Sequence, residues 1–209
     1  MGFFSVDGKL YRFLSRFWDI LRLNFCWLLF SLPIVTIGAS TAAAFSLGLR
    51  MADETETYIF GPFFKAFKEN FKKGTIIGIL NLVYFYAMYL DFQLFNAVEG
   101  NPIIFLIVGI VGTFVGVCAF LYAYALTARY ENTIPNTLRN SFDITIRYFG
   151  RSLVTVLVCL ALYVVLNWNT IMLLFFALIG PACIIYTISG TALYVFRDIE
   201  KKTREGENE

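Results

Sequence analysis

Residues 152–196 read SLVTVLVCLALYVVLNWNTIMLLFFALIGPACIIYTISGTALYVF, a run of 45 residues without one Asp, Glu, Lys or Arg. A helix rises about 1.5 Å per residue and needs about 20 residues to cross the hydrocarbon of a bilayer, so the run is long enough for two crossings. Asn167, Trp168 and Asn169 interrupt it. Because Asn favours turns and Trp favours the membrane–water boundary, the run predicts a hairpin of two membrane helices, 152–166 and 170–196.

Three more charge-free runs, 23–49, 74–90 and 100–128, precede this hairpin. The whole chain is 15% charged and 58% hydrophobic, whereas soluble domains average about 25% charged and about 45–50% apolar residues. A soluble domain would need charges on the outer faces of its helices, and these runs offer none. We therefore expect an all-α, polytopic membrane helix bundle that forms a single membrane domain over 1–209, with 74–98 and 100–128 each crossing once.

The N-terminal part, 1–22, is expected to be amphipathic, because its charges recur at helical spacing opposite an apolar face. These charged residues are Lys9, Arg12, Arg16, Asp19 and Arg22. Two interpretations remain open. Either this part lies at the membrane surface before one crossing by 23–49, or the two together enter the membrane, turn near Pro33–Gly38 and return by Arg50.

The distribution of basic residues predicts the orientation in the membrane. All 17 Lys and Arg fall in the segments 1–22, 50–73, 129–151 and 197–209, and none falls in 91–99 or 167–169. Short loops rich in Lys and Arg stay in the cytoplasm. We therefore expect six membrane segments in the cell membrane, both termini in the cytoplasm and a charged cytoplasmic tail at 197–209. Five segments with the N-terminus outside is the alternative.

Two of the basic segments carry an apolar stripe at helical spacing and predict short amphipathic helices, here called the first and second elbows. The elbows would lie at the inner membrane surface between two spanning helices. They either anchor the loops to the bilayer or dock on a partner. The candidate partner or membrane-interface contacts are Phe60, Phe63, Phe64, Phe67, Phe71, Leu138, Phe142 and Ile146.

Small residues recur at intervals of four along three of the apolar runs, a pattern that lets helix backbones approach closely in lipid. Such stripes pack either within the bundle or against a partner subunit. The residues are Ser40, Ala44, Gly48, Gly74, Gly78, Gly112 and Gly116.

The composition argues against catalysis and against several ligand classes. The chain has no His, its four Cys lie singly in apolar runs, and it lacks the phosphate-cradling pattern GxxxxGK[ST]. Without an acid–base pair we expect no enzyme, and we expect no metal and no cofactor. A net charge of +2 does not indicate a nucleic-acid partner.

Three stretches carry a family resemblance: SLPIVTIGAST at 31–41, YIFGPFFKAFKENFK at 58–72 and RYENTIPNTLRN at 129–140. They resemble the YesL-like membrane family of Gram-positive bacteria, and the resemblance runs from about Leu10 to Arg197. It implies a small multi-pass protein encoded beside carbohydrate importers of the ABC type and glycan-degrading enzymes. It implies no catalytic residues.

The resemblance and the two elbows together suggest an accessory membrane subunit that assembles with, stabilises or regulates the permease subunits of an ABC-type carbohydrate importer. A permease-like transport subunit is the first alternative, but neither 58–73 nor 129–151 contains the EAA…G loop with which importer permeases contact their ATPase. A stand-alone membrane sensor or stress protein is the second alternative. Besides permease subunits, the expected partner is the lipid bilayer.

Overall fold

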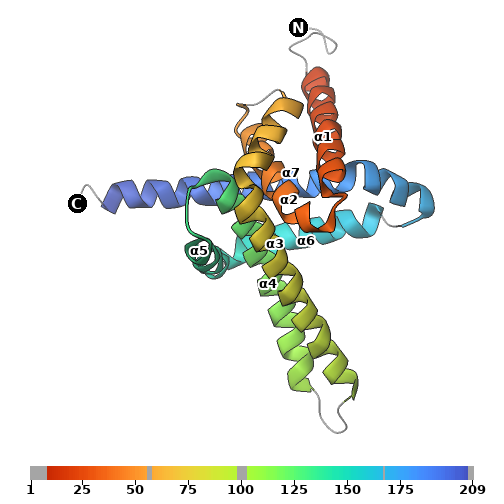
Figure 1. Ribbon diagram of the computed structural model, residues 1–209, viewed down its shortest axis with the longest axis vertical. Helices are drawn as coiled ribbons and strands as arrows, with labels where there is room; N and C mark the ends of the chain where they lie inside the picture. The colour runs from red at the N-terminus through yellow and green to blue at the C-terminus, as the bar shows by residue number, and fades with distance from the viewer. Residues whose placement is uncertain (1–8, 56–57, 98–102, 167, 207–209) are drawn as a thin grey trace.

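The computed structural model describes residues 9–55, 58–97, 103–166 and 168–206, and within these ranges every regular element is a helix (Figure 1). Two hairpins, α3–α4 and α6–α7, diverge from a common body that also holds α2. In chain order the elements are α1 (Lys9–Ser31), the 3-10 turn η1 (Ile34–Thr36), α2 (Ile37–Ala52), α3 (Phe60–Ala97), α4 (Ile103–Arg129), α5 (Ile134–Arg147), α6 (Phe149–Leu166) and α7 (Thr170–Gly206).

Four stretches of the described chain are long and apolar enough to cross a membrane: Ile34–Ala52, Phe60–Phe95, Ile103–Arg129 and Thr170–Gly206. The bent pair α5–α6 would make a fifth. This agrees with a multi-pass membrane protein of helices. α1 is not among these candidate spans, because it carries too many charged residues. The count of six membrane segments therefore stays a prediction.

The predicted break in the last apolar run is confirmed. α6 ends at Leu166 and α7 begins at Thr170. The Asn169 side chain accepts a hydrogen bond from the backbone N–H of Met172 at 2.9 Å, so it satisfies a donor that the first turn of α7 leaves open. Trp168 is 81% exposed at the tip, and Asn167 lies outside the described residues.

The two elbows differ in the structure. The first is not a helix of its own, because α3 runs from Phe60 to Ala97 without interruption and joins the elbow to the predicted crossing 74–98. Gly74, the one weak helix former at the junction, is buried against α2 and stays helical. The second elbow is a separate helix, α5, which meets α6 at 93°.

The predicted tail is also helical. α7 continues through the charged residues to Gly206, whereas we expected membrane helix up to 196 followed by a charged tail. Ion pairs one turn apart, Lys202–Asp198 at 2.8 Å and Lys201–Glu205 at 3.7 Å, favour helix in this part. Residues 207–209 lie outside the described ranges.

α2 lies at the centre of the body, with its residues from Gly38 to Leu49 buried except Thr41. Its small side chains allow close approach of three neighbours, α3, α4 and α7. The closest crossing is with α3: a Cβ added to Gly38 would lie 2.2 Å from the carbonyl oxygen of Gly74 and 2.8 Å from the Cα of Gly78. The Gly74–Gly78 stripe therefore packs inside the fold.

The remaining small residues of the predicted stripes also lie in contacts within the fold. A Cβ on Gly48 would lie 2.5 Å from the Ser189 hydroxyl of α7. The ring of Tyr84 covers Gly116, and its hydroxyl donates to the carbonyl of Gly112 at 2.8 Å. Ser40 donates to the carbonyl of Trp27 at 2.9 Å, and Ala44 is fully buried.

α1 is joined to α7 through one buried amide. Pro181 lies inside α7 and has no N–H to give to the carbonyl of Ala177. The Asn24 side chain donates to that carbonyl at 2.9 Å and accepts from the N–H of Ala182 at 3.1 Å. Asn24, which is 1% exposed, thus replaces the missing hydrogen bond of the α7 backbone.

Candidate interaction surfaces

The first turns of α3 present three exposed aromatic side chains, which we call the α3 ridge: Phe60 (58% exposed), Phe64 (45%) and Phe71 (43%). Lysines flank it, and the ammonium of Lys68 lies 4.3 Å from the centre of the Phe64 ring. An exposed apolar ridge bordered by charges is typical of a surface that binds another molecule.

Two other candidates of the first elbow face inward. Phe63 is fully buried and Phe67 is partly buried. Both pack on Phe30 of α1, with ring centres 5.5 Å and 4.9 Å apart. The ring of Phe64 also lies 5.9 Å from Phe30, but it stays 45% exposed. The predicted contact set therefore comprises an inner pair, which holds α1 against α3, and the more exposed α3 ridge.

The second elbow has two of its large apolar side chains on the outside. Phe142 (48% exposed) and Ile146 (63%) project from α5, whereas Leu138 is partly buried against the core. With Phe149 at the start of α6 (51% exposed) they form what we call the α5 outer face. The side of α5 that packs on the body carries Ile144, which is 5% exposed, beside three buried hydroxyl residues, Thr137, Ser141 and Thr145.

The charged end of α7 is tied to three other elements. Arg197 pairs with Asp53 just beyond α2. The Glu200 carboxylate accepts hydrogen bonds from Tyr130 and from Arg129, the latter at 3.1 Å. At the α5–α6 corner the Tyr148 hydroxyl donates to Asp198 at 2.7 Å. The segment predicted to be a charged cytoplasmic tail is thus joined to the rest of the fold as far as Glu200.

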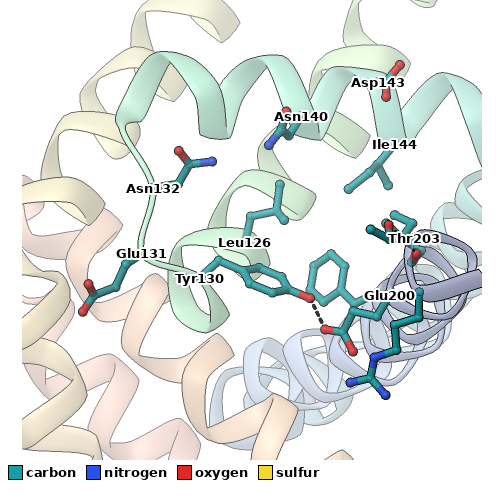
Figure 2. Close-up of a pocket in the computed structure, with 12 residues that line it drawn as sticks. Leu126, Tyr130, Glu131, Asn132, Asn140, Asp143, Ile144, Glu200 and Thr203 are labelled. Atoms are coloured by element: carbon teal, nitrogen blue, oxygen red, sulfur yellow. Dashed lines mark hydrogen bonds between the residues drawn. The ribbon is translucent and has the colours of Figure 1, made fainter. Parts of the chain in front are cut away.

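Between this part of α7 and α5 lies an open pocket of about 760 Å³ (Figure 2). Its apolar lining comprises Leu126, Ile144, Phe196 and Ile199. Figure 2 shows the Tyr130 hydroxyl pointing at Glu200 across one wall. The polar lining comprises Tyr130, Glu131, Asn132, Asn140, Asp143, Glu200, Thr203 and Arg204.

The ionisable pair in the pocket is not suited to proton transfer at neutral pH. Burial, and then the hydrogen bond to Glu200, raise the pKa of Tyr130 to about 12. The same hydrogen bond, with Arg129 nearby, lowers the pKa of Glu200. A general acid or base works best with a pKa near the operating pH. Among the described residues, no three His, Cys, Asp or Glu side chains are placed to hold a metal ion.

Sequence reasoning missed the residues that join distant elements. Asn24 was one of several weakly polar residues in apolar runs. The available signal was Pro181, because a proline inside a helix leaves a carbonyl that needs another donor. The contacts of Glu200 and Asp198 with Tyr130 and Tyr148 had no sequence signal, since the partners lie 70 and 50 residues apart.

Comparison with known proteins supports the family resemblance and adds no activity. Residues 20–92 match the family model described as "Protein of unknown function, DUF624". The chain is 27% identical over 160 residues to the "Uncharacterized protein YesL" of Bacillus subtilis (strain 168), an alignment that covers 73% of each protein. No solved structure matches the chain. Both matches support a YesL-like family of uncharacterised proteins.

Proposed function

We propose that this YesL-like chain is a non-catalytic accessory subunit of the cell membrane that binds its partner through the α3 ridge. The partner class, the permease subunits of an ABC-type carbohydrate importer, follows from the family resemblance alone. The observation that carries the binding role is the division of the first elbow, with Phe63 and Phe67 held inside while Phe60, Phe64 and Phe71 remain exposed.

The length of α3 favours a protein over lipid as the occupant of the ridge. α3 has 38 residues, or about 57 Å at 1.5 Å per residue, whereas the hydrocarbon of a bilayer is about 30 Å thick. The lysines of α3 all lie between Lys65 and Lys73, so the charge-free run 74–90, which is followed by Asp91, is the part that fits the bilayer. An uninterrupted helix then carries Phe64 and Phe60 about 15 and 21 Å beyond Gly74, away from the hydrocarbon, and at that distance a protein can cover their rings.

Removing two rings of the ridge is expected to release the partner. In a tagged protein purified in mild detergent, Phe60→Ser with Phe64→Ser should lower recovery of permease subunits at least about tenfold, because a buried Phe contributes roughly 1.5–3 kcal/mol. Membrane insertion and yield should stay close to the wild type, since Phe60 and Phe64 are 58% and 45% exposed, and of the two rings only Phe64 has an aromatic contact in the described fold, at 5.9 Å from Phe30. Quantitative mass spectrometry of the eluate measures the amount of the tagged protein and the amount of permease subunits recovered with it.

Two matched variants make this result specific. Phe142→Ser with Ile146→Ser removes similar apolar area from the α5 outer face and should leave partner recovery unchanged. Phe63→Ala should instead lower the melting temperature, because it opens a cavity beside Phe30. Partner recovery at the wild-type level from the Phe60/Phe64 variant would show that the ridge is not the interface. A wild-type eluate without any permease subunit would favour the stand-alone alternative.

The proposed orientation, with both termini in the cytoplasm, rests on the distribution of basic residues. The α3–α4 and α6–α7 hairpins leave the common body in different directions (Figure 1). Arg129 and Arg197 lie toward the C-terminal ends of α4 and α7, away from the turns that join each hairpin. Segments rich in Lys and Arg stay in the cytoplasm, so these ends would face inward.

Labelling from outside tests this orientation. With Cys26, Cys118, Cys159 and Cys183 replaced by Ala, a single Cys at Asn169 should react with a membrane-impermeant thiol reagent in intact cells. A single Cys at Glu69, which is exposed on α3, should react only after the cells are opened. Labelling of Glu69→Cys in intact cells would reverse the assignment.

A further inference from the structure

The open pocket of Figure 2 belongs to a longer groove between α5 and the charged end of α7. A second cavity, of about 410 Å³, shares Asp143, Ile144, Ile199 and Thr203 with the pocket and extends it to Tyr148. α5 packs against α4 rather than against α7, so the two walls of the groove stay apart. Two cavities that follow one another along a pair of helices suit an elongated ligand better than a compact one.

Two amide side chains of the pocket have unused hydrogen-bonding groups. Figure 2 shows Asn132, after α4, and Asn140, on α5, pointing into the pocket. The Asn132 oxygen accepts from the N–H of Thr133 at 2.8 Å, and the Asn132 amino group has no acceptor within the described chain. The Asn140 amide makes no hydrogen bond to any described residue. A side-chain amide offers the same kinds of donor and acceptor as a peptide group, so this pair is suited to bind a peptide backbone.

The bottom of the groove is aliphatic. Leu126 of α4 and Ile144 of α5 are buried there, and Ile199 of α7 is partly buried. Ile199 and Thr203 lie one turn apart on α7 and line both cavities, so this stripe of α7 faces the groove. Ligand pockets combine such an apolar surface with a few polar groups that fix the orientation of the ligand.

The charges of the pocket disfavour an acidic ligand. Its lining has three carboxylates and one guanidinium: Glu131, Asp143, Glu200 and Arg204. Asp143 is paired with Arg147 at 2.8 Å, and Glu200 is paired with Arg129 at 3.1 Å. Glu131 is exposed and has no ion pair within the described part of the chain. A basic residue of a ligand can therefore pair with Glu131, whereas an acidic residue is repelled.

We propose that the groove between α5 and α7 is a docking site for a basic peptide segment of a partner protein, with one aliphatic side chain. The Asn132 and Asn140 amides bond the backbone of the segment, its aliphatic side chain covers Ile199, and a lysine or arginine pairs with Glu131. The groove shares no residue with the α3 ridge, and its test with short peptides does not depend on the proposed function.

Two blocked peptides test the charge of the ligand on the full-length protein in a neutral detergent. Ligand-observed NMR titrations measure the affinity of N-acetyl-Lys-Leu-Lys-amide and of N-acetyl-Glu-Leu-Glu-amide. The basic peptide should bind at least about threefold more tightly, because exposed charges such as Glu131 contribute modest energies. Equal affinity of the two peptides, or tighter binding of the acidic one, would overturn the proposal.

Replacing the two amides tests the backbone contact. Asn132→Leu with Asn140→Leu should weaken binding of the basic peptide about tenfold, because each amide supplies at least one hydrogen bond. Asn136→Leu is the matched control, since Asn136 is exposed on α5 and is not part of the pocket lining, and it should bind like the wild type.

A variant that fills the groove keeps the test independent of the two amides. The Thr203 hydroxyl bonds the carbonyl of Ile199 in its own helix at 3.0 Å, and Thr203 is exposed, so Thr203→Trp should fold like the wild type and block the peptide. Wild-type affinity in either the amide variant or Thr203→Trp contradicts the proposal. An equal loss of affinity in Asn136→Leu contradicts it as well.

Discussion

Replacing Asn24 by leucine is expected to lower the free energy of unfolding by about 2–5 kcal/mol, and adding Pro181→Ala to that variant should recover most of the loss. The leucine fills a similar volume but leaves the carbonyl of Ala177 and the N–H of Ala182 without their partner. Each such buried group costs about 1–3 kcal/mol. An alanine at 181 brings back the N–H that α7 lacks, so its own backbone can then bond Ala177.

Thermal unfolding in detergent of the wild type, both single variants and the double variant measures this coupling. Thr187→Val is the matched control, because the Thr187 hydroxyl bonds only the carbonyl of Cys183 in its own helix, at 2.9 Å. It should change stability by less than about 1 kcal/mol. Additive effects of Asn24→Leu and Pro181→Ala would show that the Asn24 amide does not serve the proline site.

The second large effect is expected at the crossing of α2 and α3. Gly38→Ala should destabilise the protein by about 3 kcal/mol or more, because the new methyl group would meet the Gly74 carbonyl oxygen and the Gly78 Cα at 2.2 and 2.8 Å. Both are backbone atoms that cannot turn aside, so α2 has to move off α3 and loses contacts along its length. Folded yield after detergent extraction and the melting temperature report the change.

Gly190→Ala provides the control for this prediction. Gly190 lies within α7, and an added Cβ there meets nothing within 4 Å. The alanine should therefore stabilise the protein by about 0.5–1 kcal/mol through helix propensity alone. If Gly38→Ala melts at the same temperature as Gly190→Ala, the two helices are not in the close contact described above.

Apolar runs and turn residues were enough to predict the helical class and the last hairpin. They were not enough to separate the two elbows. Both elbows have aromatic or aliphatic residues at spacings of three and four beside basic ones, and each is followed by a glycine, Gly74 or Gly150. Gly74 packs closely on Ala39 and α3 stays helical through this junction, whereas the second elbow breaks at Tyr148, before Gly150, where the Tyr148 hydroxyl bonds Asp198 of α7 at 2.7 Å. That difference arises from a contact with a distant helix.

The candidate contact residues show the same limit. Helical spacing places Phe60, Phe64, Phe67 and Phe71 on one stripe, and periodicity alone cannot say which edge of a stripe faces inward. The position of Phe30, more than 30 residues earlier in the chain, determines that Phe63 and Phe67 are inside.

The hydrogen bonds between Asn24 and α7 can form only late in the synthesis of the chain. Asn24 and its partner Ala182 are 158 residues apart, so a ribosome must release nearly the whole polypeptide before the bond can form. Until then the Asn24 amide in α1 has no hydrogen-bond partner, and the backbone hydrogen bond that Pro181 removes from α7 is not replaced. Nascent chains that stall before residue 182 therefore all carry an Asn24 amide that lacks its partner in α7.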